Sequence, residues 1–497
     1  MNRALRRVSI ICLVLFVALL LNVNYVQGFQ ASSLANEPGN GRTFSSQFQF
    51  QRGSIITSDQ KVIAYSTMNK AAGGFQRHYP FGPLYAPVTG FDSIFSQTGV
   101  EQAENAQLAG TDPALQVHNL IDLITGKKKK GATVELTVNS AAQQAAYQAL
   151  QGSGKQGGVV AINPQTGAVL ALASNPTFDP NLLASLDGNV VGKNDKRLLS
   201  DPNQPLLSRA TDLTFPPGST FKIVTSSAAM TDSGLNAASR VYAPTRLKLP
   251  QTTQPLINFD GEACNDGSNP GGNGTVPLIF AFTVSCNTVF GNLGMKLGGQ
   301  KLQAMANQFG MNKHLSIPFP VAASNFPLYS DPPTEAGGAI GQENDTVTPL
   351  QEAMFAATIA NNGTLMKPYL VNKITAPDLT PLTTTAPTAL SHPVTPNVAG
   401  QVKQMMVNVT QSPSGTAHVS AGTAATGGIV IAAKTGTAQN GVNNIGLDDA
   451  VFTCFAPASN PQIAIGVIVK GGGQGADAAA PIAVAVIKAY LHAIGKA

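Results

Sequence analysis

The first pattern along the chain is an almost unbroken apolar run from Val8 to Leu21, extended by Val23, Tyr25 and Val26. About 20 apolar residues can span a bilayer, and the three arginines among the first seven residues favour a cytoplasmic N-terminus. A cleaved signal peptide is the alternative, but the run is long for one and no clear small-x-small cleavage site follows it. We therefore expect residues 1–26 to be an uncleaved single-pass anchor, with the rest of the chain outside the cell membrane.

The pattern then changes twice. Residues 27–50 are polar and rich in Ser, Asn and Gln, which is typical of a linker. Residues 51–152 show short alternating and helical patterns and are expected to form a small mixed N-terminal domain. The elements predicted within it are strands at 51–56, 61–65 and 133–137 and a helix at 99–108.

From residue 153 to 497 we expect a second, larger domain. Two apolar strands at 158–162 and 169–173 flank an Asn-Pro-Gln-Thr-Gly turn and form a hairpin. The other elements predicted here are a helix at 221–230, strands at 429–434, 450–455 and 462–469, and a helix at 481–493. Strands that begin and end a region with helices in its middle predict an α+β fold, an antiparallel sheet with a helical region against it.

Two segments of this second region lack regular periodicity. Residues 376–396 are rich in Thr and Pro, and we expect an exposed loop there. Residues 411–428 are small and polar and lead into the strand at 429–434. Because binding residues are often carried on such loops, we expect this second loop to border an active-site cleft.

Composition narrows the functional classes. The 497 residues suffice for two soluble domains, and the net charge of +5 is too small and too scattered to indicate nucleic-acid binding. The six histidines stand apart from one another and from the four cysteines, so no metal site is predicted.

The strongest candidate chemistry lies at Ser219 and Lys222. A Pro-Pro-Gly sequence before Ser219 predicts a tight turn, and the helix-compatible run that follows places the serine at the start of a buried helix. Residues three apart share one face of a helix. A partly desolvated lysine can take the proton of a serine hydroxyl, and a helix N-terminus favours the negative charge that develops. A second Ser-x-x-Lys, Ser58 to Lys61, lies in a polar turn and is interpreted as a surface turn.

Two further motifs follow Ser219 in order. Ser285-Cys286-Asn287 is a Ser-x-Asn sequence, and Lys434 begins a Lys-Thr-Gly sequence. The three motifs together are the signature of penicillin-binding proteins and class A β-lactamases, whereas Ser-x-x-Lys alone is weak.

From about Gly157 to its end, the chain resembles the transpeptidase domain of class B penicillin-binding proteins. The likeness extends to the hairpin around residues 163–167 and to the segments 339–342 and 348–351. The N-terminal part of the family is resembled by the segments 52–55, 99–101 and 108–110, which include Arg52 and Glu101. The short N-terminal module resembles the penicillin-binding protein A group of actinobacteria, in which that module is a non-catalytic domain of the dimerisation type.

The resemblance implies a peptidoglycan D,D-transpeptidase that cross-links stem peptides during division or growth. Ser219 would attack the penultimate D-alanine carbonyl and Lys222 would take its proton. Ser285 would relay a proton to the departing D-alanine, and Lys434 would hold that hydroxyl in a positive field. The backbone amides of Ser219 and Thr437 would form the oxyanion hole.

The same resemblance assigns the binding residues and partners. Asn287 would bind the substrate amide, and the hydroxyls of Thr435 and Thr437, with Lys434, would hold the terminal carboxylate. Gly436, between these threonines, is also assigned to substrate binding. The partners it implies are D-Ala-D-Ala stem peptides, β-lactams as covalent inhibitors, the membrane, and a homodimer or division and elongation proteins. No cofactor is implied, because neither step is redox or demands a metal.

Three alternatives share these motifs. A β-lactamase needs a base that deacylates the enzyme, and only Glu335 and Glu343 merit notice between Asn287 and Lys434; both are interpreted as capping or lining loops. A D,D-carboxypeptidase would resolve the same acyl-enzyme with water. An inactive division scaffold would not need three intact motifs.

The cysteines add one structural hypothesis. Cys264 and Cys286 both lie outside the expected membrane span, where thiols can oxidise, and Cys264 lies in a loop ahead of the helix that carries Ser285. A disulfide between them would hold that loop beside the cleft, and two free thiols are the alternative. Cys454 lies in a predicted strand and is expected to be a buried core thiol.

Overall fold

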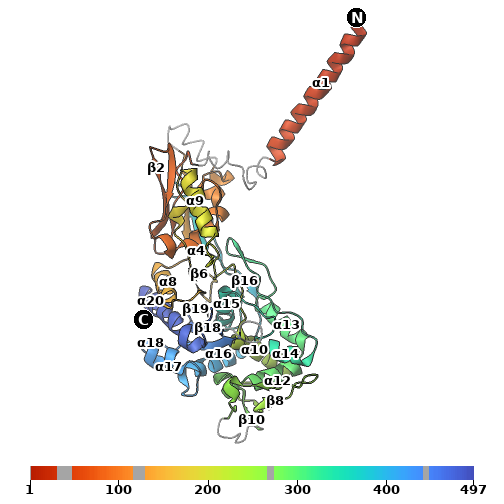
Figure 1. Cartoon of the computed structure of the whole chain (residues 1–497), viewed down its shortest axis with the longest axis vertical. Coiled ribbons are helices and arrows are strands. Elements are labelled where there is room, and N and C mark those ends of the chain that lie inside the picture. The colour runs from red at the N-terminus through yellow and green to blue at the C-terminus, as the bar shows by residue number, and fades with distance from the viewer. Residues whose placement is uncertain (1, 31–47, 116–128, 266–273, 440–446, 497) are drawn as a thin grey trace.

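The computed structural model describes residues 2–30, 48–115, 129–265, 274–439 and 447–496. Helix α1 (Asn2–Tyr25) extends away from the rest of the chain, which forms an upper and a lower region (Figure 1). The stretch Arg6–Gly28 is long and apolar enough to cross a membrane, and none of it is buried against protein. The predicted apolar N-terminal helix is therefore confirmed as a candidate span. Most of the predicted linker lies outside the described residues.

The upper region is built on a six-stranded sheet with the order β15-β14-β4-β1-β2-β3. Strand β1 runs parallel to β4, and every other neighbouring pair is antiparallel. The strands are β1 (Ile55–Ile56), β2 (Val62–Asn69), β3 (Gly74–His78), β4 (Thr133–Leu136), β14 (Val371–Thr375) and β15 (Pro381–Thr384). The expected helix at 99–108 is two short helices, α5 (Gly99–Ala103) and α6 (Asn105–Leu108).

A buried ion network joins the start of this region to helix α5. Glu101 is fully buried and lies 2.6 Å from both Arg52 Nε and Arg77 Nε through its two carboxylate oxygens. Tyr79 donates its hydroxyl to the same carboxylate over 3.2 Å. Burial alone would raise the pKa of Glu101, but Arg77 and Arg52 lower it, so the carboxylate stays charged. Arg52 and Glu101, which carry the N-terminal family resemblance, are thus bonded to each other.

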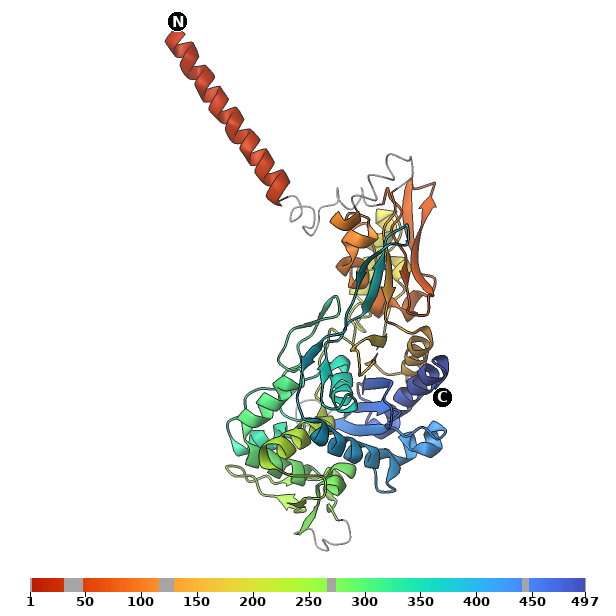
Figure 2. The same ribbon diagram turned by 180° about the vertical axis from the view of Figure 1, so that it is seen from behind.

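Two segments from later in the chain pack into the upper region. The hairpin β14–β15 completes its sheet, and helix α9 (Gly188–Leu199) buries Val191 and Leu198 in a small core with Phe91 and Phe178. The hairpin rises from the lower region into the upper sheet (Figure 2). The predicted division into residues 51–152 and 153–497 stays a prediction, because these two segments cross it.

The expectation of a loop over residues 376–396 is wrong in part. Strand β15 pairs with β14, and β16 (Ala389–Ser391) pairs with β13 (Leu365–Met366). Threonine is β-branched and suits strands, and proline is tolerated because β15 is the edge strand and Pro381 is its first residue. The predicted exposure holds for most of this segment.

The lower region contains a five-stranded antiparallel sheet with the order β17-β18-β19-β5-β6. Its strands are β5 (Gly157–Ile162), β6 (Val169–Asn175), β17 (Ala432–Ala438), β18 (Asp449–Ala456) and β19 (Ile463–Val469). All residues of β5, β18 and β19 are buried. The predicted α+β fold, with a sheet assembled from both ends of this region, is confirmed. Cys454 is buried in β18 as expected.

Helices surround this sheet. Helix α15 (Pro349–Ala360) packs across β19, β5 and β18, whereas α8 (Ser140–Gly152) and α20 (Ala480–Ala493) pack against each other and against the sheet. The C-terminal stretch that includes α20 is also apolar enough to span a membrane, but half of it is buried in the core. The remaining helices named below are α10 (Lys222–Ser233), α11 (Leu278–Thr283), α12 (Asn287–Leu297), α13 (Gly299–Gln308), α14 (Pro332–Gly338) and α16 (Pro396–Gln411).

Candidate active site

Ser219 lies in a single turn of 3₁₀ helix, Gly218–Phe221, that leads directly into α10. Gly218 has a φ of 55°, and a Cβ there would lie 2.8 Å from the carbonyl oxygen of Thr437. Gly218 N–H donates to Gly341 O over 2.9 Å. Because only glycine fits this backbone conformation and this close approach, the Pro-Pro-Gly sequence fixes the serine between the Lys-Thr-Gly strand and the Gly341 loop.

Lys222 is completely buried, and its amine lies among four oxygen atoms. Lys222 Nζ is 2.9 Å from Ser219 Oγ and 2.7 Å from Asn287 Oδ1. It is 2.8 Å from Ser285 O and 3.1 Å from Ser285 Oγ. The first two sequence motifs therefore meet at a single nitrogen atom.

Ser285 lies at the end of α11 with a φ of 62°, a left-handed conformation that is uncommon for residues other than glycine. Its hydroxyl is 2.8 Å from Lys434 Nζ. Lys434 is also completely buried and donates to Thr435 O over 2.9 Å. A backbone conformation of this kind costs free energy and is frequent at functional sites. Ser285 Oγ thus connects the amines of Lys222 and Lys434.

Both amines have lowered pKa values. Burial, followed by the nearby Lys434, lowers the pKa of Lys222 well below its usual range. Burial lowers the pKa of Lys434 to about 7. The described residues place no carboxylate in an ion pair with either lysine. Lys222 is therefore the amine better suited to accept a proton near neutral pH.

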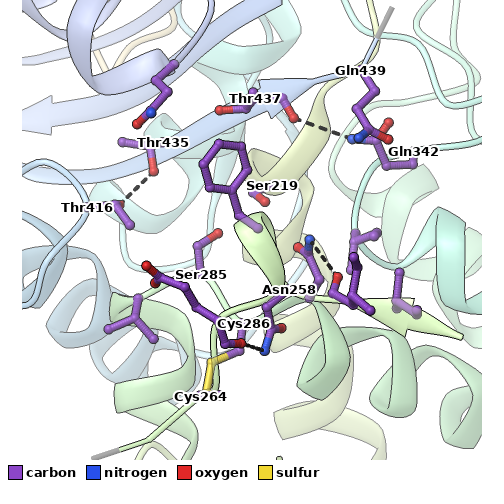
Figure 3. A pocket seen from close by; sticks show the side chains of 18 of the residues that line it. Ser219, Asn258, Cys264, Ser285, Cys286, Gln342, Thr416, Thr435, Thr437 and Gln439 are labelled. Carbon is purple, nitrogen blue, oxygen red and sulfur yellow. Dashed lines mark hydrogen bonds between the residues drawn. A yellow bond between two sulfur atoms is a disulfide. The ribbon is translucent and has the colours of Figure 1, made fainter. Parts of the chain in front are cut away.

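The Lys-Thr-Gly sequence lies within β17, which is an edge strand. A Cβ at Gly436 would lie 2.8 Å from Pro217 O and 3.1 Å from the Thr220 methyl carbon, so glycine lets the strand approach the Ser219 turn. Thr435 and Thr437 both line the cleft in front of Ser219 (Figure 3). The predicted strand at 429–434 begins later than expected and continues through the motif.

The cleft around Ser219 has a volume of about 830 Å³. Ser285, Asn287, Thr435 and Thr437 line it together with Ser219. The structure thus brings every residue predicted for the site to this cleft or beside it, because Lys222, Lys434 and Gly436 contact the lining residues from behind. The assigned catalytic and binding roles stay predictions.

The disulfide hypothesis is confirmed. Cys264 and Cys286 are bonded, with Cα atoms 5.9 Å apart, and both line the lower wall of the cleft (Figure 3). Asn258, in the same loop as Cys264, accepts the backbone N–H of Thr288 over 3.0 Å. The loop before α11 is therefore attached at the middle residue of the Ser-x-Asn motif and at the residue that follows the motif.

Sequence reasoning missed several residues of the site. Thr416 lies 2.7 Å from Thr435, Oγ1 to Oγ1, and it belongs to the 411–428 loop that was expected to border the cleft. That loop contains two short helices, His418–Ala421 and Thr423–Thr426. Glu352 is buried behind the Ser219 turn, and its position as the one charged residue between Asp345 and Lys367 was the signal that could have found it.

The two acidic residues noted between Asn287 and Lys434 lie in different places. Glu335 accepts the backbone N–H of Gly299 over 2.9 Å at the start of α13, so it caps that helix as expected. Glu343 lines the cleft, and burial, followed by Asp331, raises its pKa. Within the described parts of the chain, no group of three His, Cys, Asp or Glu side chains could hold a metal ion.

Two protein families match this chain. Residues 157–488 match the penicillin binding protein transpeptidase domain, and residues 52–134 match the penicillin binding protein A dimerisation domain. The chain therefore belongs to the class B penicillin-binding proteins, as its motifs predicted.

Similar curated proteins carry consistent names. The chain is 40% identical to the peptidoglycan D,D-transpeptidase PbpA of Mycolicibacterium smegmatis and 39% identical to that of Mycobacterium tuberculosis, over 99% of each chain. It is 28% identical to the peptidoglycan D,D-transpeptidase MrdA of Escherichia coli, over 80% of this chain and 69% of that protein.

Solved structures agree with the fold. Penicillin-binding protein A of M. tuberculosis superposes with a TM-score of 0.83 at 38% identity, over 89% of this chain and 99% of that chain. Its acyl-enzyme complex with penicillin G superposes with a TM-score of 0.82, over 89% of this chain and 100% of that chain.

Proposed function

We propose that this protein is a peptidoglycan D,D-transpeptidase that works through a serine acyl-enzyme and is acylated by β-lactams. It is 39–40% identical over nearly its full length to curated enzymes of that activity, and structures of a similar protein are β-lactam acyl-enzyme complexes. The observation that carries the proposal for its own residues is the arrangement of oxygen atoms around Lys222 Nζ.

A count of hydrogen bonds at Lys222 supports its role as the base. A neutral amine has two N–H groups and one lone pair. Ser285 O and Asn287 Oδ1 can only accept, and they lie 2.8 and 2.7 Å from Nζ, so they take the two N–H groups. The lone pair is then left for a hydroxyl hydrogen, and the Ser219 hydroxyl at 2.9 Å is closer than the Ser285 hydroxyl at 3.1 Å. A charged ammonium would instead point a third N–H at Ser219 and could not take its proton.

Acylation then follows from these positions. Lys222 Nζ takes the hydroxyl proton while Ser219 Oγ forms a bond to the carbonyl carbon of the penultimate D-alanine. The backbone N–H groups of Ser219 and Thr437 stabilise the oxyanion, which is usually the largest single contribution to catalysis. The C–N bond breaks when the leaving nitrogen receives a proton through Ser285 Oγ, which contacts both Lys222 and Lys434.

The binding roles follow from the cleft wall. A substrate carboxylate at the end of β17 would accept hydrogen bonds from the hydroxyls of Thr435 and Thr437, in the field of Lys434. Asn287, whose side-chain oxygen is engaged by Lys222, presents its amide nitrogen to the cleft side and to Ile257 O at 3.4 Å. That nitrogen would donate to the substrate's amide carbonyl, and Gly436 contributes by letting β17 approach.

The acyl-enzyme is resolved by an amine of a second stem peptide, which forms the cross-link. Resolution by water, as in a D,D-carboxypeptidase or a β-lactamase, needs a base that activates the water. Glu335 is committed to a helix cap, and the carboxyl of Glu343 packs against Gly337 of α14. Lys222 is engaged with the acylated serine. We therefore expect a β-lactam adduct on Ser219 that persists, and intact motifs argue against an inactive scaffold.

The remaining assignments extend this proposal. Helix α1 anchors the protein in the cell membrane, with the arginine-bearing N-terminus inside and the catalytic region outside. Residues 51–152 form the non-catalytic domain and residues 153–497 the transpeptidase domain. A second copy of the chain or division and elongation proteins are its protein partners.

The test uses the full-length protein in detergent. Ser219→Ala and Lys222→Ala should fail to bind fluorescent penicillin covalently, whereas wild type should gain one drug mass on the peptide that contains Ser219. Lys61→Ala is the matched control, because it alters the other Ser-x-x-Lys and should acylate normally. A drug adduct on Ser219→Ala, or rapid turnover of many drug molecules by wild type, would contradict the proposal.

A further inference from the structure

Helix α15 carries an acidic residue in a position where charge is costly. All residues of this helix are buried, and Glu352 is its only ionisable residue. The side chain of Glu352 is completely buried. It lies over Gly466, where an added Cβ would be 2.6 Å from the Glu352 Cβ. The helix therefore approaches the centre of the five-stranded sheet closely at this residue.

The carboxyl of Glu352 reaches the turn that carries Ser219. Its Oε1 atom is 2.8 Å from Thr220 Oγ1, and Thr220 Oγ1 is also 2.8 Å from Pro217 O. Thr220 is fully buried and follows Ser219 in the chain. Pro217 and Thr220 thus hold the turn from behind, and both also contact Gly436 of the Lys-Thr-Gly strand.

Counting hydrogens determines which way these bonds run. The Thr220 hydroxyl has one hydrogen and Pro217 O can only accept, so the hydroxyl donates to Pro217 O. The short contact between Thr220 and Glu352 then requires a hydrogen from the carboxyl. An ionised carboxylate could accept the Thr220 hydrogen only if the Pro217 carbonyl lost it.

The surroundings of Glu352 also favour a neutral acid. Its Oε2 atom is buried and has no partner among the described residues. Burial raises the pKa of this carboxyl to about 8, and even a hydrogen bond accepted from Thr220 would offset only part of that rise. A buried carboxylate without a cation is strongly disfavoured.

Charged groups around α15 do not reach this carboxyl. Strands β5, β13 and β19 carry no titratable side chain; β18 carries Asp449 and Cys454, and α16 carries Lys403. In the sheet, Thr453 of β18 pairs with Lys434 of β17 on one side and with Gly466 of β19 on the other. Because Glu352 lies over Gly466, Thr453 separates it from Lys434. The amine of Lys222 bonds to Ser219, Ser285 and Asn287 and does not contact Glu352.

We infer that Glu352 is a protonated carboxylic acid that positions the nucleophile, donating to Thr220, which in turn donates to Pro217 O and so fixes the turn of Ser219. The inference rests on the proposed acyl transfer by Ser219, because the turn matters for activity only if that serine reacts. Glu352 does not touch substrate and is a positioning residue.

The consequence is a dependence of acylation on alkaline pH. When Glu352 ionises above pH about 8, it stops donating to Thr220 and competes with Pro217 O for the one hydroxyl hydrogen. Loss of one buried hydrogen bond corresponds to a fall of about tenfold in the acylation rate. The titration of Lys434 affects the same pH range, so wild type must be compared with a variant that lacks only the Glu352 proton.

Glu352→Gln is that variant, because its amide N–H can donate to Thr220 at every pH. With full-length protein in detergent and fluorescent penicillin, we expect Glu352→Gln to acylate at pH 7 within about threefold of wild type. The ratio of variant to wild-type rates should rise by about tenfold between pH 7 and pH 9.5. Glu352→Leu and Thr220→Val should both be about tenfold slower at pH 7, and the double variant no slower than either.

Infrared difference spectra test the protonation directly, without any activity. At pH 7 wild type should show the C=O stretch of a protonated carboxylic acid that Glu352→Gln lacks. Asp345→Asn is the matched control, because it removes a different buried carboxyl, one that bonds to Tyr329, and it should leave the Glu352 band in place.

The outcomes separate this inference from the proposed function. No difference band for Glu352 at pH 7, or equal pH profiles for wild type and Glu352→Gln, would overturn the inference even if Ser219 is acylated as proposed. A Glu352→Gln variant as slow as Glu352→Leu at pH 7 would also overturn it. Acylation of Ser219→Ala would defeat the proposed function and leave the infrared result to stand alone.

Discussion

Replacing Lys434 by methionine should stabilise the protein at neutral pH. Lys434 is completely buried, and the described residues place no carboxylate against it. Its amine is kept for the reaction at the expense of stability. Methionine is similar in size, is unbranched and carries no charge, so it can fill the same space beside Phe282.

The magnitude follows from the pKa of Lys434, which burial lowers from 10.5 to about 7. Each pKa unit corresponds to about 1.4 kcal/mol, so the buried amine costs about 4 to 5 kcal/mol of unfolding free energy at pH 7. The variant removes the hydrogen bonds of Lys434 to Thr435 O and Ser285 Oγ. Their loss costs about 1 to 2 kcal/mol together, because Ser285 Oγ keeps its contact with Lys222. A net gain of about 3 kcal/mol over the roughly 330 residues that match the transpeptidase family raises Tm by about 4 °C.

The sign of the pH dependence is fixed by the direction of the shift. Unfolded Lys434 holds its proton up to pH 10.5, whereas the folded amine loses it near pH 7. The penalty is therefore complete below pH 7 and fades as the pH rises toward 10.5. The advantage of Lys434→Met should shrink over this window and become a small disadvantage near pH 10.

Differential scanning calorimetry of the full-length protein in detergent measures Tm. The unfolding transition of the catalytic region is recognised in wild type as the one that penicillin shifts. Lys470→Met is the control, because Lys470 lies at the end of the same sheet but is exposed, and its replacement should leave Tm within about 1 °C. A lower Tm for Lys434→Met at pH 7, or a difference that does not change between pH 7 and pH 10, would refute the reasoning.

Three further outcomes are expected. The rate of acylation by penicillin should rise with pH as Lys222 loses its proton, and it should rise at lower pH than for an exposed lysine because burial lowers the pKa of Lys222. A rate that does not change with pH in stopped-flow measurements would remove Lys222 as the base. Glu101→Gln should lower the unfolding free energy by about 3 to 5 kcal/mol in denaturant titrations because two buried arginines lose their shared carboxylate, whereas the nearby Glu104→Gln should change it little. Cys286→Ser should lower the unfolding free energy by about 3 kcal/mol, because it opens a loop of 22 residues. A reducing agent should destabilise wild type by the same amount and should not destabilise the variant further.

The sequence could predict the parts of the structure that depend on neighbours in the chain. The strands around residues 163–167 were predicted within one or two residues, because continuous apolar runs and a Pro-Gly-type turn act locally. The turn before Ser219 was likewise readable, since proline and glycine restrict the backbone wherever they occur. The loop over 376–396 was predicted wrongly because its strands exist only through pairing with β13 and β14.

The composition of the site was also open to sequence reasoning, since three short motifs with fixed spacing specify its residue types. Their meeting at Ser285 Oγ, which contacts both Lys222 and Lys434, was not. The three motifs are brought together there by packing of α10, the segment between α11 and α12, and β17. The pairing of Cys264 with Cys286 stayed open for the same reason.

The sequence by itself determined the apolar N-terminal helix, the alternation of strands and helices, and the residues that could do chemistry, because periodicity and motif spacing are local properties. Only the tertiary structure decided the charge states of those residues. Lys222 and Lys434 have lowered pKa values and Glu352 a raised one because the fold removes each from water without an opposite charge beside it. Burial is a property of the whole fold, so no pattern within a single segment specifies it.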